Sequence, residues 1–143
     1  MTRVAAFDCG TNTIKVLVAD LHVGTGEQIE LLRDLRMVRL GEGVDRTGLL
    51  AHEAIARTFA AIDEFHSMIE QYDVQAMRFC ATSAVRDAAN SESFQRGVLT
   101  RLGVPAEVLT GDEEARLSFQ GATRTLPDRE EPTLVVDLSL LHI

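Results

Sequence analysis

Residues 8–13 (DCGTNT) place one carboxylate, one glycine, two threonine hydroxyls and one asparagine within six positions. Gly10 and Asn12 tolerate positive φ, so the backbone can turn tightly here and direct successive N–H groups into one concavity. Such a turn suits a phosphate group, and Asp8 beside it can hold a hydrated divalent cation. The alternative is an ordinary polar hairpin turn, and spacing alone leaves both interpretations open.

A second polar cluster, residues 82–87 (TSAVRD), follows directly after an apolar run. Hydroxyls and N–H groups at the start of a helix, with the Arg86 guanidinium one turn later, form a good site for an oxyanion. The alternative is structural: Thr82 or Ser83 caps a helix, and Arg86 pairs with a nearby acid such as Asp87. Both interpretations stay open at this level.

Two adjacent acids, Glu113 and Glu114, form a third cluster. Thr110 and Glu113 have the spacing of a capping box, and the helix dipole favours acids in a first helical turn. Glu114 points about 100° around the helix from its neighbour and is not needed for that box. One glutamate can therefore be structural while Glu114 faces a ligand, although spacing alone does not make it catalytic.

The elements that position these clusters follow from the hydrophobic pattern. Residues 4–7 and 14–19 are typical of two buried strands of a hairpin, and residues 29–39 of a third strand. Residues 52–71 carry apolar side chains at steps of four, three, three and four, which predicts a long amphipathic helix. The chain therefore opens with three antiparallel strands and then a helix.

Strands and helices alternate in the remainder of the chain. The predicted elements are strands at 76–81, 106–109 and 133–138, a helix that Asn90 or Ser91 can cap, and a helix from 111 to about 122. This order predicts an α/β domain with a mixed sheet. In such sheets ligands gather where strands end and loops converge, and all three polar clusters lie at such places.

Composition and charge exclude several classes of function. A chain of 143 residues is one ordinary domain, and no window approaches the ~18 apolar residues of a membrane span. The net charge of −8 argues against nucleic-acid binding, and a phosphate-rich ligand would need local groups to overcome that field. Cys9 and Cys80 resemble buried small hydrophobes, which favours a reduced, cytoplasmic chain over a disulfide-bonded one.

Four motifs in register carry a resemblance to a known family: residues 3–13 (RVAAFDCGTNT), 38–43 (VRLGEG), 81–88 (ATSAVRDA) and 111–117 (GDEEARL). With them the chain resembles the N-terminal domain of the exopolyphosphatase/guanosine pentaphosphate phosphatase (Ppx/GppA) family, within the actin-like ATPase superfamily. The first motif alone would fit several actin-like enzymes. The last two together are specific and separate this family from the superfamily's kinases.

The resemblance implies an actin-like (ribonuclease H-like) fold of two lobes, with the active site between them. The implied reaction is hydrolytic release of terminal phosphate from inorganic polyphosphate, or conversion of pppGpp to ppGpp, in a homodimeric parent enzyme. Such a site needs an in-line water and a cation that neutralises developing charge. By position, the resemblance assigns catalysis to Glu114, phosphate contacts to Gly10, Thr11, Asn12 and Arg86, and a divalent metal such as Mg²⁺ to Asp8 and Asp137.

The chain departs from the family pattern after Asp137. The family continues with a glycine-rich loop (DxGGGSTE), whereas residues 137–143 read DLSLLHI. We therefore expect residues 1–137 to be the N-terminal lobe, residues 138–143 to be an off-family tail, and the second lobe to be absent. Such a chain should be inactive by itself. The rivals are an ATP-dependent kinase or ATPase lobe, and a non-catalytic regulatory lobe that pairs with another chain.

Overall fold

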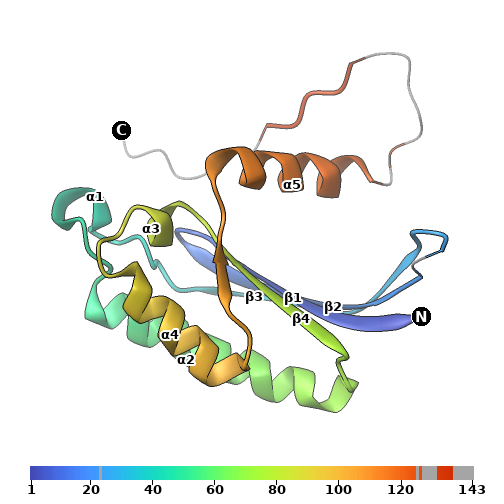
Figure 1. Cartoon of the computed structure of the whole chain (residues 1–143), viewed down its shortest axis with the longest axis horizontal. Coiled ribbons are helices and arrows are strands. Elements are labelled where there is room, and N and C mark those ends of the chain that lie inside the picture. Colours follow the sequence, from blue (N-terminus) through green and yellow to red (C-terminus); the bar gives the residue numbers. More distant parts are fainter. Residues whose placement is uncertain (23, 125, 127–131, 137–143) are drawn as a thin grey trace.

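The computed structural model describes residues 1–22, 24–124, 126 and 132–136 of the protein (Figure 1). Its centre is a five-stranded sheet with the order β3-β2-β1-β4-β5. β1 pairs antiparallel with β2 and parallel with β4, which confirms the predicted mixed sheet with three antiparallel opening strands. The strands are β1 (Thr2–Cys9), β2 (Thr13–Leu21), β3 (Gln28–Met37), β4 (Ala76–Ala81) and β5 (Ala106–Val108).

The helices lie on both sides of this sheet. The two long helices α2 and α4 run along one face, and α5 lies across the other side (Figure 1). None of the helices among the described residues is long and apolar enough to cross a membrane. The helical elements are α1 (Val44–Thr47), α2 (His52–Ile69), the 3-10 turn η1 (Glu70–Tyr72), α3 (Ser83–Arg86), α4 (Ser91–Leu102) and α5 (Gly111–Thr123).

The core fills the space between the sheet and the pair α2 and α4. Because side chains alternate across a strand, Phe7 and Phe79 point into this space from paired positions on β1 and β4, with ring centroids 5.6 Å apart. Phe65 of α2 packs on Phe7 from the helix side, at 6.3 Å. The predicted periodicity of α2 is confirmed, since Ile62 and Phe65 are fully buried.

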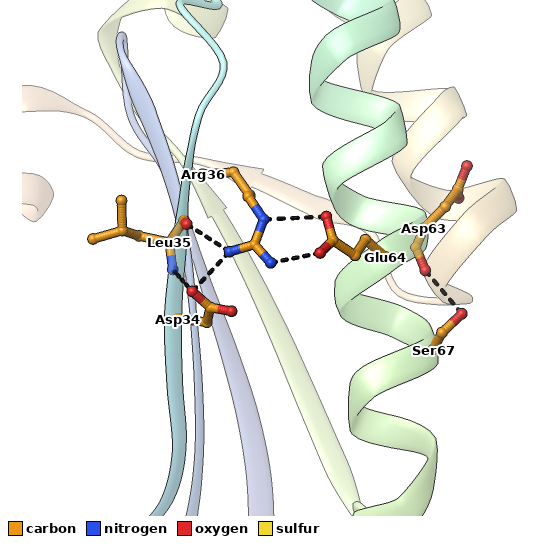
Figure 2. Close-up of polar contacts among 6 residues, drawn as sticks. All are labelled: Asp34, Leu35, Arg36, Asp63, Glu64 and Ser67. Atoms are coloured by element: carbon orange, nitrogen blue, oxygen red, sulfur yellow. Dashed lines mark hydrogen bonds and ion pairs between the residues drawn. The ribbon is translucent and has the colours of Figure 1, made fainter.

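Strand β3 is tied to α2 by the guanidinium of Arg36 (Figure 2). Two hydrogen bonds run from Arg36 to the carboxylate of Glu64, and a third runs to Asp34 at 2.7 Å. The same guanidinium lies 5.2 Å from the centroid of the Phe65 ring. These bonds raise the pKa of Arg36 and lower that of Glu64, so the edge strand is held to the helix by groups that stay charged.

The hairpin differs from the prediction in the length of its turn. β1 continues to Cys9 and β2 begins at Thr13, because Asp8 pairs with Lys15 and Cys9 with Ile14 across the hairpin. The connection therefore has three residues rather than six. β3 also ends at Met37 instead of residue 39, since Arg39 adopts a left-handed backbone with φ of 50° and leaves the strand geometry.

Two further predictions are wrong. The expected strand at 133–138 is not formed over 132–136, where Leu134 is 85% exposed, and residues 137–138 lie outside the described part. An apolar run becomes a strand only beside an edge that takes its hydrogen bonds, and no described strand pairs with it. Asn90 precedes α4 without capping it, because its amide bonds both backbone groups of Leu50.

Candidate active site

A cavity of about 590 Å³ joins the three polar clusters that the sequence singles out. Its walls come from the ends of β1 and β4, the hairpin turn and the first half of α5. Asp8 and the turn of residues 10–12 line one part, Thr82 and Ser83 a second, and Glu114 a third. Clusters spread over more than 100 positions of the chain, from Asp8 to Glu114, thus meet at one place.

The turn of residues 10–12 is closed by a hydrogen bond from the Gly10 N–H to the Thr13 carbonyl, at 3.0 Å. Gly10 and Asn12 tolerate positive φ, but the turn does not use it there, and among the described residues positive φ occurs elsewhere. The two strands extend to Cys9 and Thr13, and one backbone hydrogen bond bridges the short gap.

Asp8 faces the cavity beside a cation that the sequence argument missed. Lys15 Nζ donates to Asp8 Oδ2 at 3.0 Å, and both side chains are about half exposed (54% and 53%). The hairpin register supplies the contact: with Cys9 paired to Ile14, positions 8 and 15 are direct partners across the hairpin. The cavity therefore has a lysine beside its first acid.

A divalent cation at Asp8 would have to keep most of its water. No group of three or more histidine, cysteine or acidic side chains gathers within the described residues. Mg²⁺ retains several waters and needs one or two carboxylates, so the half-exposed Asp8 fits a hydrated Mg²⁺. Asp137, the second acid expected here, lies outside the described residues.

The second cluster is bonded to the turn. Thr11 Oγ1 and Ser83 Oγ lie 2.9 Å apart, and the Thr82 N–H donates to the Cys9 carbonyl at 3.2 Å. Neither Thr82 nor Ser83 caps α3 through its side chain, so the structural alternative for these hydroxyls is wrong. The Ser83 hydroxyl instead supports the Thr11 side chain at the edge of the cavity.

Arg86 contacts Asp87, the acid that the structural interpretation named, and also Glu114. Its Nη1 donates to the Leu109 carbonyl at 2.7 Å and lies 3.5 Å from Glu114 Oε2. Its Nε lies 3.7 Å from Asp87 Oδ1. Arg86 therefore bridges α3 to the strand end that leads into α5, and its guanidinium reaches the carboxylate of Glu114.

Glu113 and Glu114 have the different surroundings that the spacing suggested. The Glu113 N–H donates to Thr110 Oγ1 at 3.2 Å, and the Thr110 N–H donates to Glu113 Oε2 at 2.9 Å, which is the predicted capping box. The hydrogen bond from the Thr110 backbone lowers the pKa of Glu113, with help from the Thr110 hydroxyl. Glu114 is about one-third exposed (35%) and lines the cavity.

The two cysteines are free thiols on opposite faces of the sheet. Cys9 is buried in the core, and burial raises the pKa of its thiol. Cys80 was expected to be buried too, but it is partly exposed and lines the cavity, because it pairs with Asp8 and shares its face of the sheet. Two side chains on opposite faces do not reach each other to form a disulfide.

Comparisons with known proteins place the chain in one family. The sequence model of the Ppx/GppA phosphatase family matches residues 19–139. Exopolyphosphatase 2 of Mycobacterium tuberculosis is 46% identical over 145 residues, an alignment that covers 96% of this chain and 46% of that protein. The chain thus spans about half the length of the curated relative that it matches.

Solved structures agree with this placement. An exopolyphosphatase-like protein is 42% identical with a TM-score of 0.83, over 90% of this chain and 38% of that one. A Ppx/GppA family member from Aquifex aeolicus is 29% identical with a TM-score of 0.78, over 87% of this chain and 40% of that one. The fold is that of the actin-like ATPases, as the sequence motifs predict. The chain belongs to the Ppx/GppA phosphatase family.

Proposed function

We propose that this chain is the phosphate-binding N-terminal lobe of an exopolyphosphatase, which hydrolyses the terminal phosphate of inorganic polyphosphate. The observation that carries the proposal is the single cavity lined by Asp8, the turn of residues 10–12 and Glu114. The name of the relative at 46% identity supports polyphosphate over guanosine pentaphosphate. Both substrates end in a phosphoanhydride, so the same groups would act on either.

In this proposal the hairpin turn of residues 10–12 and two cationic side chains bind the phosphate. The backbone of Gly10, Thr11 and Asn12 and the hydroxyl of Thr11 contact the terminal phosphate. Lys15, which lines the cavity, and Arg86, which reaches Glu114 at its border, offset the phosphate charge. These two cations supply local positive charge, which offsets the repulsion between an anionic ligand and a chain of net charge −8. Mg²⁺ beside Asp8 would supply further neutralisation of the phosphate oxygens when bound.

Glu114 is the group that would act on water. It enters the cavity from α5, whereas Asp8 enters it from β1, so a phosphate between them has a carboxylate on the α5 side. That carboxylate orients a water for in-line attack and accepts its proton as the water oxygen bonds to phosphorus. The bridging oxygen then leaves with the shortened polyphosphate chain. Arg86 holds the Glu114 carboxylate in place from the side.

The remaining half of the longer relatives would complete the cleft. We propose that residues 1–137 form the first lobe, that residues 138–143 are an off-family tail, and that the active form is a cytoplasmic homodimer of two-lobed chains. The partial overlap with the relatives supports only the two-lobed form, since this chain corresponds to 46% of the exopolyphosphatase. Asp137 would then be a second metal-linked acid at the boundary between the lobes.

A docking lobe without catalysis is the second candidate. The face of the sheet opposite α2 and α4 exposes apolar side chains of β3, with Leu35 55% and Met37 62% exposed. Contiguous exposed apolar surface is typical of contact sites between proteins or lobes. This observation favours contact with another lobe or chain, and it does not by itself require chemistry.

The experiment compares this chain with a chimera in which the second half of the M. tuberculosis relative follows residue 136. We expect the chain to bind tripolyphosphate in the presence of Mg²⁺, measured by calorimetry, but to release little phosphate. The chimera should release phosphate from polyphosphate steadily. Binding of ATP more tightly than tripolyphosphate would favour the kinase alternative, and a folded chimera that binds tripolyphosphate without turnover would favour the docking lobe.

A further inference from the structure

The hairpin turn of residues 10–12 is held from outside by the segment of residues 38–41. The N–H groups of Val38 and Arg39 both donate to the Asn12 carbonyl, each at 2.8 Å. The Gly41 N–H donates to the Thr11 carbonyl at 2.9 Å. Three backbone hydrogen bonds from one short segment therefore fix two consecutive peptide groups of the turn.

That segment is itself anchored in the core. Val38 and Leu40 are 2% and 0% exposed, so their side chains cannot shift without disturbing the packing. Arg39 lies between them in the left-handed conformation, with φ of 50°. A non-glycine residue rarely adopts this conformation unless its surroundings impose it, and the paired bonds to the Asn12 carbonyl do so here.

Gly41 lies against the side chain of Thr11 with no room for a methyl group. A Cβ at position 41 would overlap the Cγ2 methyl of Thr11 and lie 3.3 Å from the Cβ of Ala84. The φ of Gly41 is not in the left-handed region, so an alanine there is excluded by space and not by backbone strain. Residues 38–43 contribute to the family resemblance, but the contact between Gly41 and Thr11 does not follow from the sequence.

The Thr11 side chain is also held on its other side. Its hydroxyl is bonded to Ser83 Oγ at 2.9 Å, while its methyl fills the space that the missing Gly41 side chain leaves. One rotamer satisfies both contacts. Displacing the methyl therefore also displaces the hydroxyl that borders the cavity.

We propose that residues 38–41 act as a clamp that fixes the turn of residues 10–12 for phosphate binding, with Gly41 as the positioning residue for Thr11. This inference rests on the proposed function, because it takes the turn to be the phosphate-binding element. Gly41 is not among the residues that line the cavity. It acts by leaving space for one threonine rotamer, so its effect passes through Thr11.

The test is a pair of substitutions that create and then remove the same overlap. Gly41→Ala introduces a methyl group against Thr11, and Thr11→Ser removes the methyl that it meets while keeping the hydroxyl. The double variant should therefore recover what Gly41→Ala loses. Gly121→Ala on α5 is the matched control, since a Cβ placed there meets no atom within 4 Å apart from its chain neighbours and the backbone of its own helix.

Binding of tripolyphosphate with Mg²⁺ is measured by calorimetry for each variant of the full chain. We expect Gly41→Ala to weaken binding at least tenfold, Gly121→Ala to change it less than twofold, and the double variant to come within threefold of Thr11→Ser. Wild-type affinity in Gly41→Ala would overturn the proposal. A double variant that folds but binds more than tenfold more weakly than Thr11→Ser would do the same, even if Gly41→Ala alone does not fold.

Amide hydrogen exchange without ligand separates this inference from the proposed function. Exchange at Gly10, Val38 and Arg39 should be at least tenfold faster in Gly41→Ala than in wild type and should slow again in the double variant. If Gly41→Ala does not fold but the double variant does, amide exchange in the double variant should match that in Thr11→Ser. Unchanged exchange in a folded Gly41→Ala would exclude the clamp. If the variants show this exchange pattern but the wild-type chain does not bind tripolyphosphate, the phosphate-binding function is rejected and the clamp is retained.

Discussion

Two neighbouring glutamates at the start of α5 have different surroundings, since Glu113 belongs to the capping box and Glu114 lines the cavity. The Glu113 carboxylate is used by the capping box with Thr110, whereas the Glu114 carboxylate faces the cavity and lies 3.5 Å from Arg86. The helix geometry alone directs these side chains about 100° apart. We therefore expect Glu114 to act in catalysis and Glu113 to stabilise the helix.

Replacing Glu114 should affect turnover far more than substrate binding. In the chimera, Glu114→Gln should lower kcat by roughly 100-fold or more while changing KM little, because a glutamine orients water but cannot take its proton. Steady-state phosphate release over a range of polyphosphate concentrations measures both constants. Glu113→Gln serves as the control, since glutamine also completes a capping box. An unchanged kcat in Glu114→Gln would reject Glu114 as the catalytic group.

At the scale of elements, α5 stands apart from the other long helices. The structure describes all of its residues and none of them is buried, while α2 and α4 each bury at least three side chains. Its first turn is fixed by the capping box and by the contacts of Arg86. A helix held at one end in this way depends on its cap more than on packing.

Acid should therefore weaken α5 through Glu113. The capping hydrogen bonds hold the pKa of Glu113 below its ordinary value, so this stabilisation is fully present above the unfolded pKa of about 4.3. It is lost as the pH falls through the lower folded pKa. Far-UV ellipticity of the wild type should decrease between pH 5 and pH 2 more than that of Glu113→Gln, which keeps the box without titrating. Identical profiles would exclude this contribution.

The sequence predicts the elements that local residues determine, and it is less reliable for elements and side-chain positions that depend on distant parts of the chain. The α2 periodicity and the α5 cap are local, so both helices are predicted close to their observed bounds. The strand at 133–138 was predicted from β-branched and apolar residues, yet residues 132–136 form none, since a strand requires a partner. The three polar clusters were found by composition. Lys15, Cys80 and Gly41 were missed because their places follow only from strand register and close packing.

At the scale of the molecule, the two faces of the sheet differ in what covers them. The core lies on the side of α2 and α4, and the opposite side carries α5 above the cavity (Figure 1). The side chains of Leu35 and Met37 on β3 remain largely exposed. If a second lobe completes the protein, this uncovered face is a surface on which it can pack.

Leu35→Gln should therefore act differently in the chain and in the chimera. In the chain the substitution should change the free energy of unfolding by less than about 0.5 kcal/mol, as is usual at exposed positions. In the chimera the loss should exceed about 1 kcal/mol if the second half buries this side chain. Urea titrations of both proteins measure this, with Leu99→Gln, 48% exposed on α4, as the control. Equal changes in both proteins would show that the second half leaves Leu35 uncovered.

Alternate side chains of strand β1 point into the core and toward the cavity. Phe7 and Cys9 are buried, while Asp8 between them faces the cavity. Deleting or inserting one residue upstream of Asp8 would exchange the two faces, placing a carboxylate among the phenylalanines and a phenyl ring in the cavity. Evolution can therefore substitute residues in this strand one at a time, but it cannot change the strand's length there by one without losing folding and binding together.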